Sequence, residues 1–220
     1  MRPLPLPLTL TARLLPVVIL AVTGWAWTSD PGASSAERTD ASSGSGATPS
    51  ASATAVAVQT YRTSPAPCDS MSDKTIKSLV PGAKTAGKEL ASTDKSVRRT
   101  CAWNALKGYD YRWLDVTFEI KDDDAAAQKA YKQRIAEKSG GGAVPGLGDT
   151  AYSVVNLTTE DKQETREGVV IVSASNALVV VTYNGSDFET KKAPSTDEIN
   201  KGAIKAAKDA VAALEDGRQN

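Results

Sequence analysis

Two short runs of apolar residues, separated by a turn, constrain the fold of this chain more than any other feature. Residues 169–172 read Val-Val-Ile-Val, and residues 178–181 read Leu-Val-Val-Val. A strand with one solvated face alternates apolar and polar side chains, whereas a continuous apolar run is typical of a strand buried on both faces. The sequence Ser-Ala-Ser-Asn between the runs favours a turn. The pattern predicts two strands, 168–174 and 177–184, that are covered on both sides.

Other segments predict the elements around this pair of strands. Residues 112–120 alternate apolar and polar side chains, which is typical of a strand with one buried face. Further strands are predicted at 99–105 and 151–157, and helices near Ser72, after the acidic run 122–124 and after the capping-box sequence 195–198. The order α-β-β-α-β-β-β-α does not repeat a β-α-β unit, so we expect an α+β sandwich: a mostly antiparallel sheet of about five strands with helices packed on it. Alanine along one face of the last helix implies close packing on the sheet.

A glycine-rich stretch at residues 139–151 reads SGGGAVPGLGDTA. Phosphate-binding loops follow a strand and open a helix, so that the ligand meets free N–H groups. Here a helix is expected to end near Lys138 and a strand to begin near Ala151, which is the reverse order. Gly140 suits a left-handed helix cap, and the later Pro-Gly pair favours a turn. We therefore interpret the stretch as structural and expect no cofactor.

Composition excludes several classes of function. The chain has no histidine, so a Ser-His-Asp or Cys-His site is impossible and the usual zinc ligand is missing. The acidic run 122–124 lacks the spacing of a calcium loop, and we expect no metal site. The chain has 26 Lys and Arg against 26 Asp and Glu, which provides no attractive field for phosphates. We therefore expect no nucleic-acid partner.

The first 27 residues have the parts of an export signal. Arg2 and Arg13 precede the uncharged apolar run 14–27. Two tryptophans near the cleavage position make it a poor one, which favours an uncleaved signal-anchor that spans the membrane through residues 8–27. A cleaved signal peptide is the alternative. The first case places the protein in the cell membrane with its domain on the extracytoplasmic side, and the second makes it secreted.

Domain organisation follows from the composition of the rest of the chain. Residues 28–66 are dominated by Ser, Thr, Ala, Gly and Pro, which is typical of a flexible linker, although residues 55–61 alternate weakly and could form an edge strand. Residues 67–216 are predicted to form the extracytoplasmic α+β domain. Outside the cell, the pair Cys68 and Cys101 indicates a structural disulfide, with two free buried thiols as the alternative.

Three aromatic residues form the candidate binding surface. Tyr109, Tyr111 and Trp113 share one strand face by a period of two, opposite Leu114 and Val116. If this face is exposed, it is a contact surface, and if it is covered, it belongs to a second core.

Short motifs suggest a relationship. Cys101-Ala-Trp103, the Gly146-Leu-Gly-Asp149 turn and the late helix resemble an actinobacterial family of uncharacterised secreted and cell-surface lipoprotein-like domains, over about residues 67–214. The resemblance implies an exported, disulfide-bonded α+β domain without an established reaction. The lipid-accepting cysteine of that family is missing here, which favours a protein anchor or secretion.

The sequence thus favours a non-enzymatic binding or interaction domain of the cell envelope. Its partner would be an envelope lipid, a wall polymer or a membrane protein. The alternative is a histidine-independent envelope hydrolase. Such an enzyme would use carboxylates among Glu119, Asp149 and Glu167, or the Ser92–Lys95 pair, which has Ser-x-x-Lys spacing.

Overall fold

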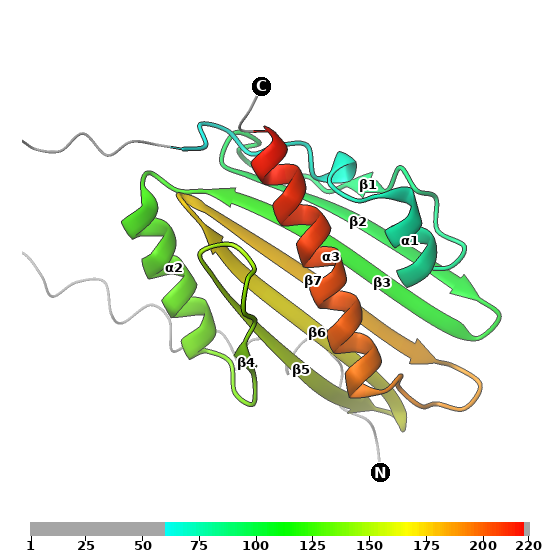
Figure 1. The fold of residues 1–220 in the computed structure, drawn as a ribbon. Helices are drawn as coiled ribbons and strands as arrows, with labels where there is room; N and C mark the ends of the chain where they lie inside the picture. The colour runs from blue at the N-terminus through cyan, green and yellow to red at the C-terminus, as the bar shows by residue number, and fades with distance from the viewer. Residues whose placement is uncertain (1–59, 218–220) are drawn as a thin grey trace, which may run out of the picture. The chain divides into compact units, whose positions relative to one another are not determined.

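A single antiparallel sheet forms the centre of the domain (Figure 1). The computed structural model describes residues 60–217, so the predicted signal-anchor at 1–27 and most of the predicted linker lie outside the described residues. The sheet has the strand order β1-β2-β3-β7-β6-β5-β4. Its strands are β1 (Lys88–Glu89), β2 (Arg98–Lys107), β3 (Asp110–Ile120), β4 (Gly142–Ala143), β5 (Thr150–Glu160), β6 (Gln163–Ala174) and β7 (Ala177–Asp187).

The predicted α+β class is confirmed, but the sheet is larger than expected. The five long strands correspond to the five predicted ones, and the two additional strands, β1 and β4, lie at the edges of the sheet. Each of these contains only two residues, which is too short to carry an alternating pattern. The prediction of about five strands was therefore wrong in number and in order.

Among residues 60–217, four helical segments accompany the sheet: the 3-10 turn η3 (Pro67–Asp69), α1 (Asp73–Leu79), α2 (Asp124–Ala136) and α3 (Thr196–Asp216). The N-terminus of each α-helix is capped by a side chain. Ser72, Asp123 and Ser195 accept hydrogen bonds from the backbone N–H of Thr75, Ala126 and Glu198, respectively. These caps satisfy N–H groups that have no partner within the helix. Within residues 60–217, no helix has the length and apolar character needed to cross a membrane.

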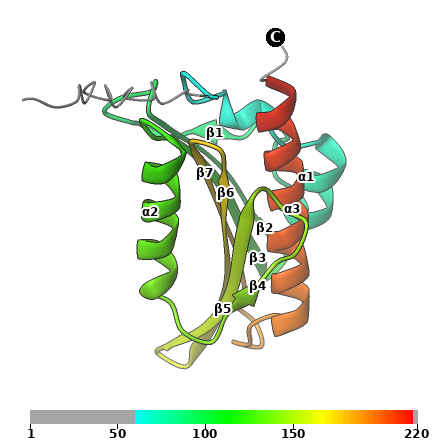
Figure 2. The same cartoon turned by 60° about the vertical axis from the view of Figure 1, so that its left-hand side comes forward.

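The helices cover both faces of the sheet. Figure 2 shows α2 on one side of the strands and α1 and α3 on the other. Val170 and Val172 of β6 belong to the core that includes α3, whereas Val169 and Ile171 pack with Tyr131 of α2. Because successive strand residues point to opposite faces, a continuous apolar run supplies both cores. The prediction that these strands are buried on both sides is confirmed.

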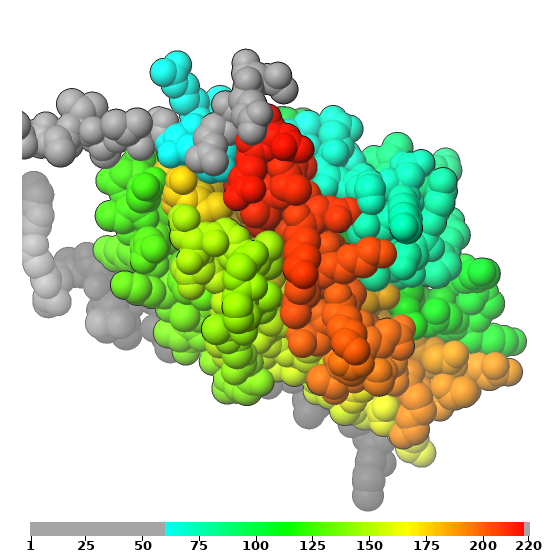
Figure 3. Space-filling model, in the orientation of Figure 1, coloured from blue at the N-terminus to red at the C-terminus, as the bar shows by residue number. Residues whose placement is uncertain are grey.

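Small residues allow α3 to lie close to the sheet. A Cβ placed on Gly202 would lie 2.5 Å from Cε1 of Tyr183, and one placed on Gly168 would lie 2.9 Å from Cγ2 of Ile199. The alanines of the sheet-facing side of α3 are fully buried at positions 203, 206, 207 and 210. Figure 3 shows that α3 and the neighbouring segments fill the surface over the central strands on this side.

The packed domain begins earlier than expected. Tyr61 is 7% exposed, its N–H donates to Oδ1 of Asn176 at 2.8 Å, and its carbonyl accepts from Nδ2 of the same side chain at 2.8 Å. Ser64 is also buried, and its N–H donates to the carbonyl of Ser96. Packed residues therefore occur within the segment predicted as a linker, where hydrogen bonds and the burial of the Tyr61 ring in the core hold the chain.

The predicted disulfide is present between Cys68 and Cys101 and joins η3 to β2. The glycine-rich stretch forms turns and the edge strand β4. Gly140, Gly146 and Gly148 have positive φ values, and Asp149 closes the stretch onto the β6–β7 turn through its N–H and its carboxylate. The stretch therefore follows a helix and precedes a strand, as expected for a structural role.

Candidate functional site

One face of the sheet is only partly covered by a helix. On this face α2 packs against β6 and β7, where Leu178 and Ile171 are buried. Figure 1 shows α2 towards one end of the strands, whereas α3 runs along the other face. We call the remaining part of this face the open face. It consists of Tyr111, Trp113, Asp115 and Thr117 of β3, Thr182 and Asn184 of β7, and Glu167 of β6, which the strand register places on the same side.

The predicted aromatic residues lie at one end of the open face. Tyr111 and Trp113 are both half-buried, and the ring of Tyr111 lies 6.0 Å from that of Phe188. Tyr109 is 57% exposed in the turn between β2 and β3, where its carbonyl accepts from the N–H of Phe188. Because Tyr109 lies outside the strand, alternation places only Tyr111 and Trp113 on one face. The remaining tryptophan of the described chain, Trp103, is 1% exposed and belongs to the opposite core.

Asp115 joins the aromatic end of the open face to its polar centre. Nε1 of Trp113 donates to Oδ2 of Asp115 at 3.1 Å, which holds the indole ring in one orientation. Burial raises the pKa of Asp115, and the charge of Glu167 raises it further, against hydrogen bonds from Trp113 and Thr182. Two carboxylates that influence each other thus lie on neighbouring parts of one surface. Sequence reasoning missed Asp115 because it occupies an ordinary polar position of an alternating strand.

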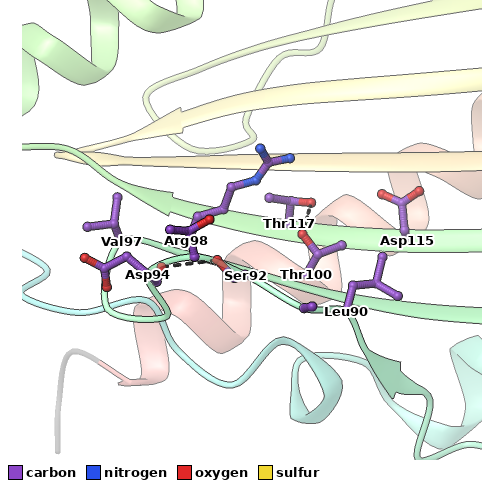
Figure 4. Close-up of a pocket in the computed structure, with 10 residues that line it drawn as sticks. Leu90, Ser92, Asp94, Val97, Arg98, Thr100, Asp115 and Thr117 are labelled. Atoms are coloured by element: carbon purple, nitrogen blue, oxygen red, sulfur yellow. Dashed lines mark hydrogen bonds between the residues drawn. The ribbon is translucent and has the colours of Figure 1, made fainter.

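A polar hollow adjoins Asp115. Its volume is about 620 Å³, within the range typical of small-molecule sites. Figure 4 shows its residues on β2, β3 and the loop that precedes β2. The lining residues are Leu90, Ala91, Ser92, Thr93, Asp94, Val97, Arg98, Thr100, Asp115 and Thr117. The hydroxyls of Thr100 and Thr117 lie 2.8 Å apart and hydrogen-bond to each other.

The nominated Ser-Lys pair is not assembled. The Ser92 hydroxyl donates to the carbonyl of Asp94 at 3.2 Å, and Nζ of Lys95 pairs with Glu89 at 3.4 Å. A serine nucleophile needs a base within hydrogen-bonding reach, and here each member of the pair is engaged elsewhere. Among residues 60–217, no cluster of three or more acidic or cysteine side chains could hold a metal ion.

The nominated carboxylates occupy different environments. Glu119 is buried in an ion-pair cluster with Arg134 at 2.6 Å, Lys121 at 3.1 Å and Arg98 at 3.5 Å. Asp149 caps the β6–β7 turn, so only Glu167 lies on the open face. Burial alone would raise the pKa of Glu119, but the hydrogen bonds and charges of Arg134 and Lys121 hold it below its ordinary value.

The Glu119 cluster gives a pH-dependent prediction. Replacing Glu119 with glutamine is expected to lower the free energy of unfolding by about 2 kcal/mol at neutral pH, because a buried charge-assisted network is lost. A carboxylate with a lowered pKa in the folded state stabilises above its ordinary pKa of about 4.3, and this stability is lost as the pH falls through the lower value. Denaturant titrations of the wild-type protein and the variant are carried out at a series of pH values from 7 down through the pKa of Glu119. The difference between their free energies of unfolding should shrink as the pH falls. A difference that grows on acidification would contradict the assignment.

Comparison with known proteins adds little to this geometry. No family model matches the chain, and no curated protein matches it. A solved structure from Bacteroides thetaiotaomicron VPI-5482, determined at 1.50 Å resolution, is similar to part of the chain, with 11% identity and a TM-score of 0.31. The match covers 50% of this chain and 50% of that one, so this chain spans about half the length of the protein it matches. A likeness this weak carries no conclusion about function.

Proposed function

We propose that this protein is a non-enzymatic binding domain of the cell envelope, and that its ligand contacts the open face. The observation that carries the proposal is the combination of the half-buried Tyr111 and Trp113 with Asp115 and the adjoining hollow. Aromatic side chains that keep one side in water are typical of contact surfaces. The ligand would be a wall polymer, an envelope lipid or a membrane protein.

The sequence and the disulfide support the location. The predicted export signal places the domain on the extracytoplasmic side, either tethered to the membrane or secreted, and the Cys68–Cys101 disulfide suits an oxidising compartment. The resemblance to secreted actinobacterial domains is consistent with this proposal. A domain held at the membrane by a linker would meet its ligand within the envelope layer.

A second function is favoured by one observation. Asp115, with its raised pKa, and Glu167, whose charge contributes to that shift, lie on the same face. Two carboxylates facing one surface, one of them with a pKa raised by burial, are the pattern of histidine-independent hydrolysis of glycosides. This alternative requires turnover of the bound material, and a binding domain requires only retention.

The experiment compares the wild-type full chain with Trp113→Ala in binding to cell walls from the organism that encodes it. The walls are freed of lipid, so that the membrane segment does not contribute. We expect the variant to lose at least tenfold in affinity, because an aromatic anchor of a contact surface contributes more than about 1.4 kcal/mol. Retention is measured by sedimentation, and turnover by release of soluble wall fragments.

The controls separate binding from folding. Leu157→Ala removes a side chain that is 50% exposed on the opposite face of the sheet, and it should leave binding unchanged. If the Trp113→Ala protein does not fold, Trp113→Phe is used in its place, because it keeps an aromatic ring at this position. Retention that survives both changes at Trp113 would refute the open face as the binding surface, and fragment release that is lost in Asp115→Asn would favour the hydrolase.

A further inference from the structure

A row of side chains crosses the open face at right angles to the strands and extends beyond it onto β2 and β5. The register pairs Asn104 of β2 with Trp113 of β3, Trp113 with Asn184 of β7, Asn184 with Glu167 of β6, and Glu167 with Asn156 of β5. Residues directly opposite in neighbouring antiparallel strands point to the same side. We call these five residues the amide row. Four strand spacings give it a length of about 19 Å.

The side chains of the amide row are accessible. Asn104 and Asn156 are exposed, and Trp113, Asn184 and Glu167 are half-buried. The hydrogen bonds within residues 60–217 leave the three amides and the Glu167 carboxylate without a side-chain partner, whereas Trp113 donates to Asp115. The row therefore offers amide donors, amide acceptors and a carboxylate around one fixed indole ring.

This combination of groups matches the surface of a sugar. A pyranose ring presents C–H groups on its faces, which pack against an aromatic ring, and hydroxyls around its rim, which both donate and accept hydrogen bonds. Amide side chains provide both functions to such hydroxyls, and carboxylates accept from them. The adjoining Thr100 and Thr117 hydroxyls in the hollow extend the same chemistry along β2 and β3.

The charge of the surface selects against anionic ligands. Asp115 and Glu167 are the acidic residues of the open face, and Glu167 already raises the pKa of Asp115. The cation that lines the hollow, Arg98, pairs with Glu119 at 3.5 Å and is thus partly neutralised. A phosphate or carboxylate of a ligand placed on the amide row would be repelled, whereas a neutral hydroxyl would be attracted.

We propose that the amide row binds a neutral oligosaccharide laid across the strands, with Trp113 packed against a sugar ring and Asn184 bonded to its hydroxyls. This inference rests on the proposed function and names the chemical class of its ligand. The row provides binding groups on several strands in sequence, so a chain of sugars is favoured over a single one.

The test uses the full chain with short neutral oligosaccharides of glucose, mannose, galactose, arabinose and N-acetylglucosamine. Oligogalacturonate serves as the matched anionic sugar. We expect at least one neutral oligosaccharide to bind and to change tryptophan fluorescence, and the same signal to be absent with Trp113→Phe. Asn184→Ala should weaken binding about tenfold, since a pair of hydrogen bonds to the ligand is lost.

A matched amide provides the control. Gln133→Ala removes an exposed amide from α2, away from the amide row, and should leave affinity unchanged. Preference for oligogalacturonate, or binding of no neutral oligosaccharide, would overturn the inference. If walls are still retained through Trp113 in that case, the proposed function stands and only the ligand class is wrong. If wall retention is also independent of Trp113, both proposals fail.

Discussion

Replacing Gly202 with leucine is expected to lower the free energy of unfolding by about 3 kcal/mol or more. A Cβ at this position would lie 2.5 Å and 2.7 Å from two ring carbons of Tyr183, and 3.2 Å from Cδ2 of Leu79. Tyr183 is 3% exposed, and its hydroxyl donates to the carbonyl of Leu79 at 2.8 Å. The ring therefore cannot move aside without breaking a buried hydrogen bond and separating α3 from the sheet.

The alanine variant tests the same clash through its sign. Within a helix, Gly→Ala normally stabilises by about 0.5–1 kcal/mol. At position 202 we expect destabilisation instead, because the methyl group meets Tyr183. Gly142→Ala is the control, since a Cβ there meets nothing within 4 Å. Denaturant unfolding followed by circular dichroism gives the free energies of unfolding of the wild-type protein, Gly202→Ala and Gly142→Ala. A stabilised Gly202→Ala protein would show that α3 does not approach the sheet this closely.

Loss of the disulfide is expected to have a similarly large effect. The bridge joins Cys68 to Cys101 across a sequence separation of 33 residues. Closing a loop of this length restricts the unfolded chain by about 4 kcal/mol in the entropic description. We expect the Cys68→Ala, Cys101→Ala double variant to lose about this amount of stability. Both positions change together, so that no free thiol remains to pair with another molecule.

Reductant distinguishes the bridge from the packing of its atoms. Cys101 is fully buried beside Trp103, so part of any loss in the double variant could come from packing. A thiol reductant breaks the bridge and leaves the atoms in place. The wild-type protein should therefore unfold at lower denaturant in reductant, and the double variant should not respond. A wild-type protein whose unfolding is unaffected by reductant would show that the bridge does not stabilise the fold.

Much of the fold could be predicted because its signals are local. The continuous apolar runs of β6 and β7 predicted strands covered on both faces, and the alanines of α3 predicted its close packing. The capping sequence at Ser195 predicted the start of α3, and the Ser195 hydroxyl accepts from the N–H of Glu198. In a full capping box the Glu198 side chain would bond back to the helix start, but here it accepts from Arg112 at 2.7 Å. The edge strands β1 and β4 could not be predicted, since two residues carry no period and their pairing depends on neighbours distant in sequence.

The candidate site was predicted only in part for the same reason. Alternation along β3 placed Tyr111 and Trp113 together, because that pattern lies within one strand. The amide row depends instead on β3 lying beside β7, although the two are separated in the chain by a helix and three strands. Asn184 and Glu167 look like ordinary surface residues until this strand order brings them into one row with Trp113.

The attachment of the N-terminal segment determines how the domain would carry a mechanical load. Tension on the chain before Tyr61 would first reach the Asn176 side chain, which also donates to the carbonyl of Lys121 and so connects to β3 and β7. If these bonds and those of Ser64 break, the next point of attachment is Cys68, from which the covalent bridge passes the force directly to β2. The segment between the two cysteines, with α1 and the loop that lines the hollow, is thereby bypassed. A domain tethered at one end and holding a wall polymer on its open face would stay folded under a pull that would otherwise unravel it from the N-terminus.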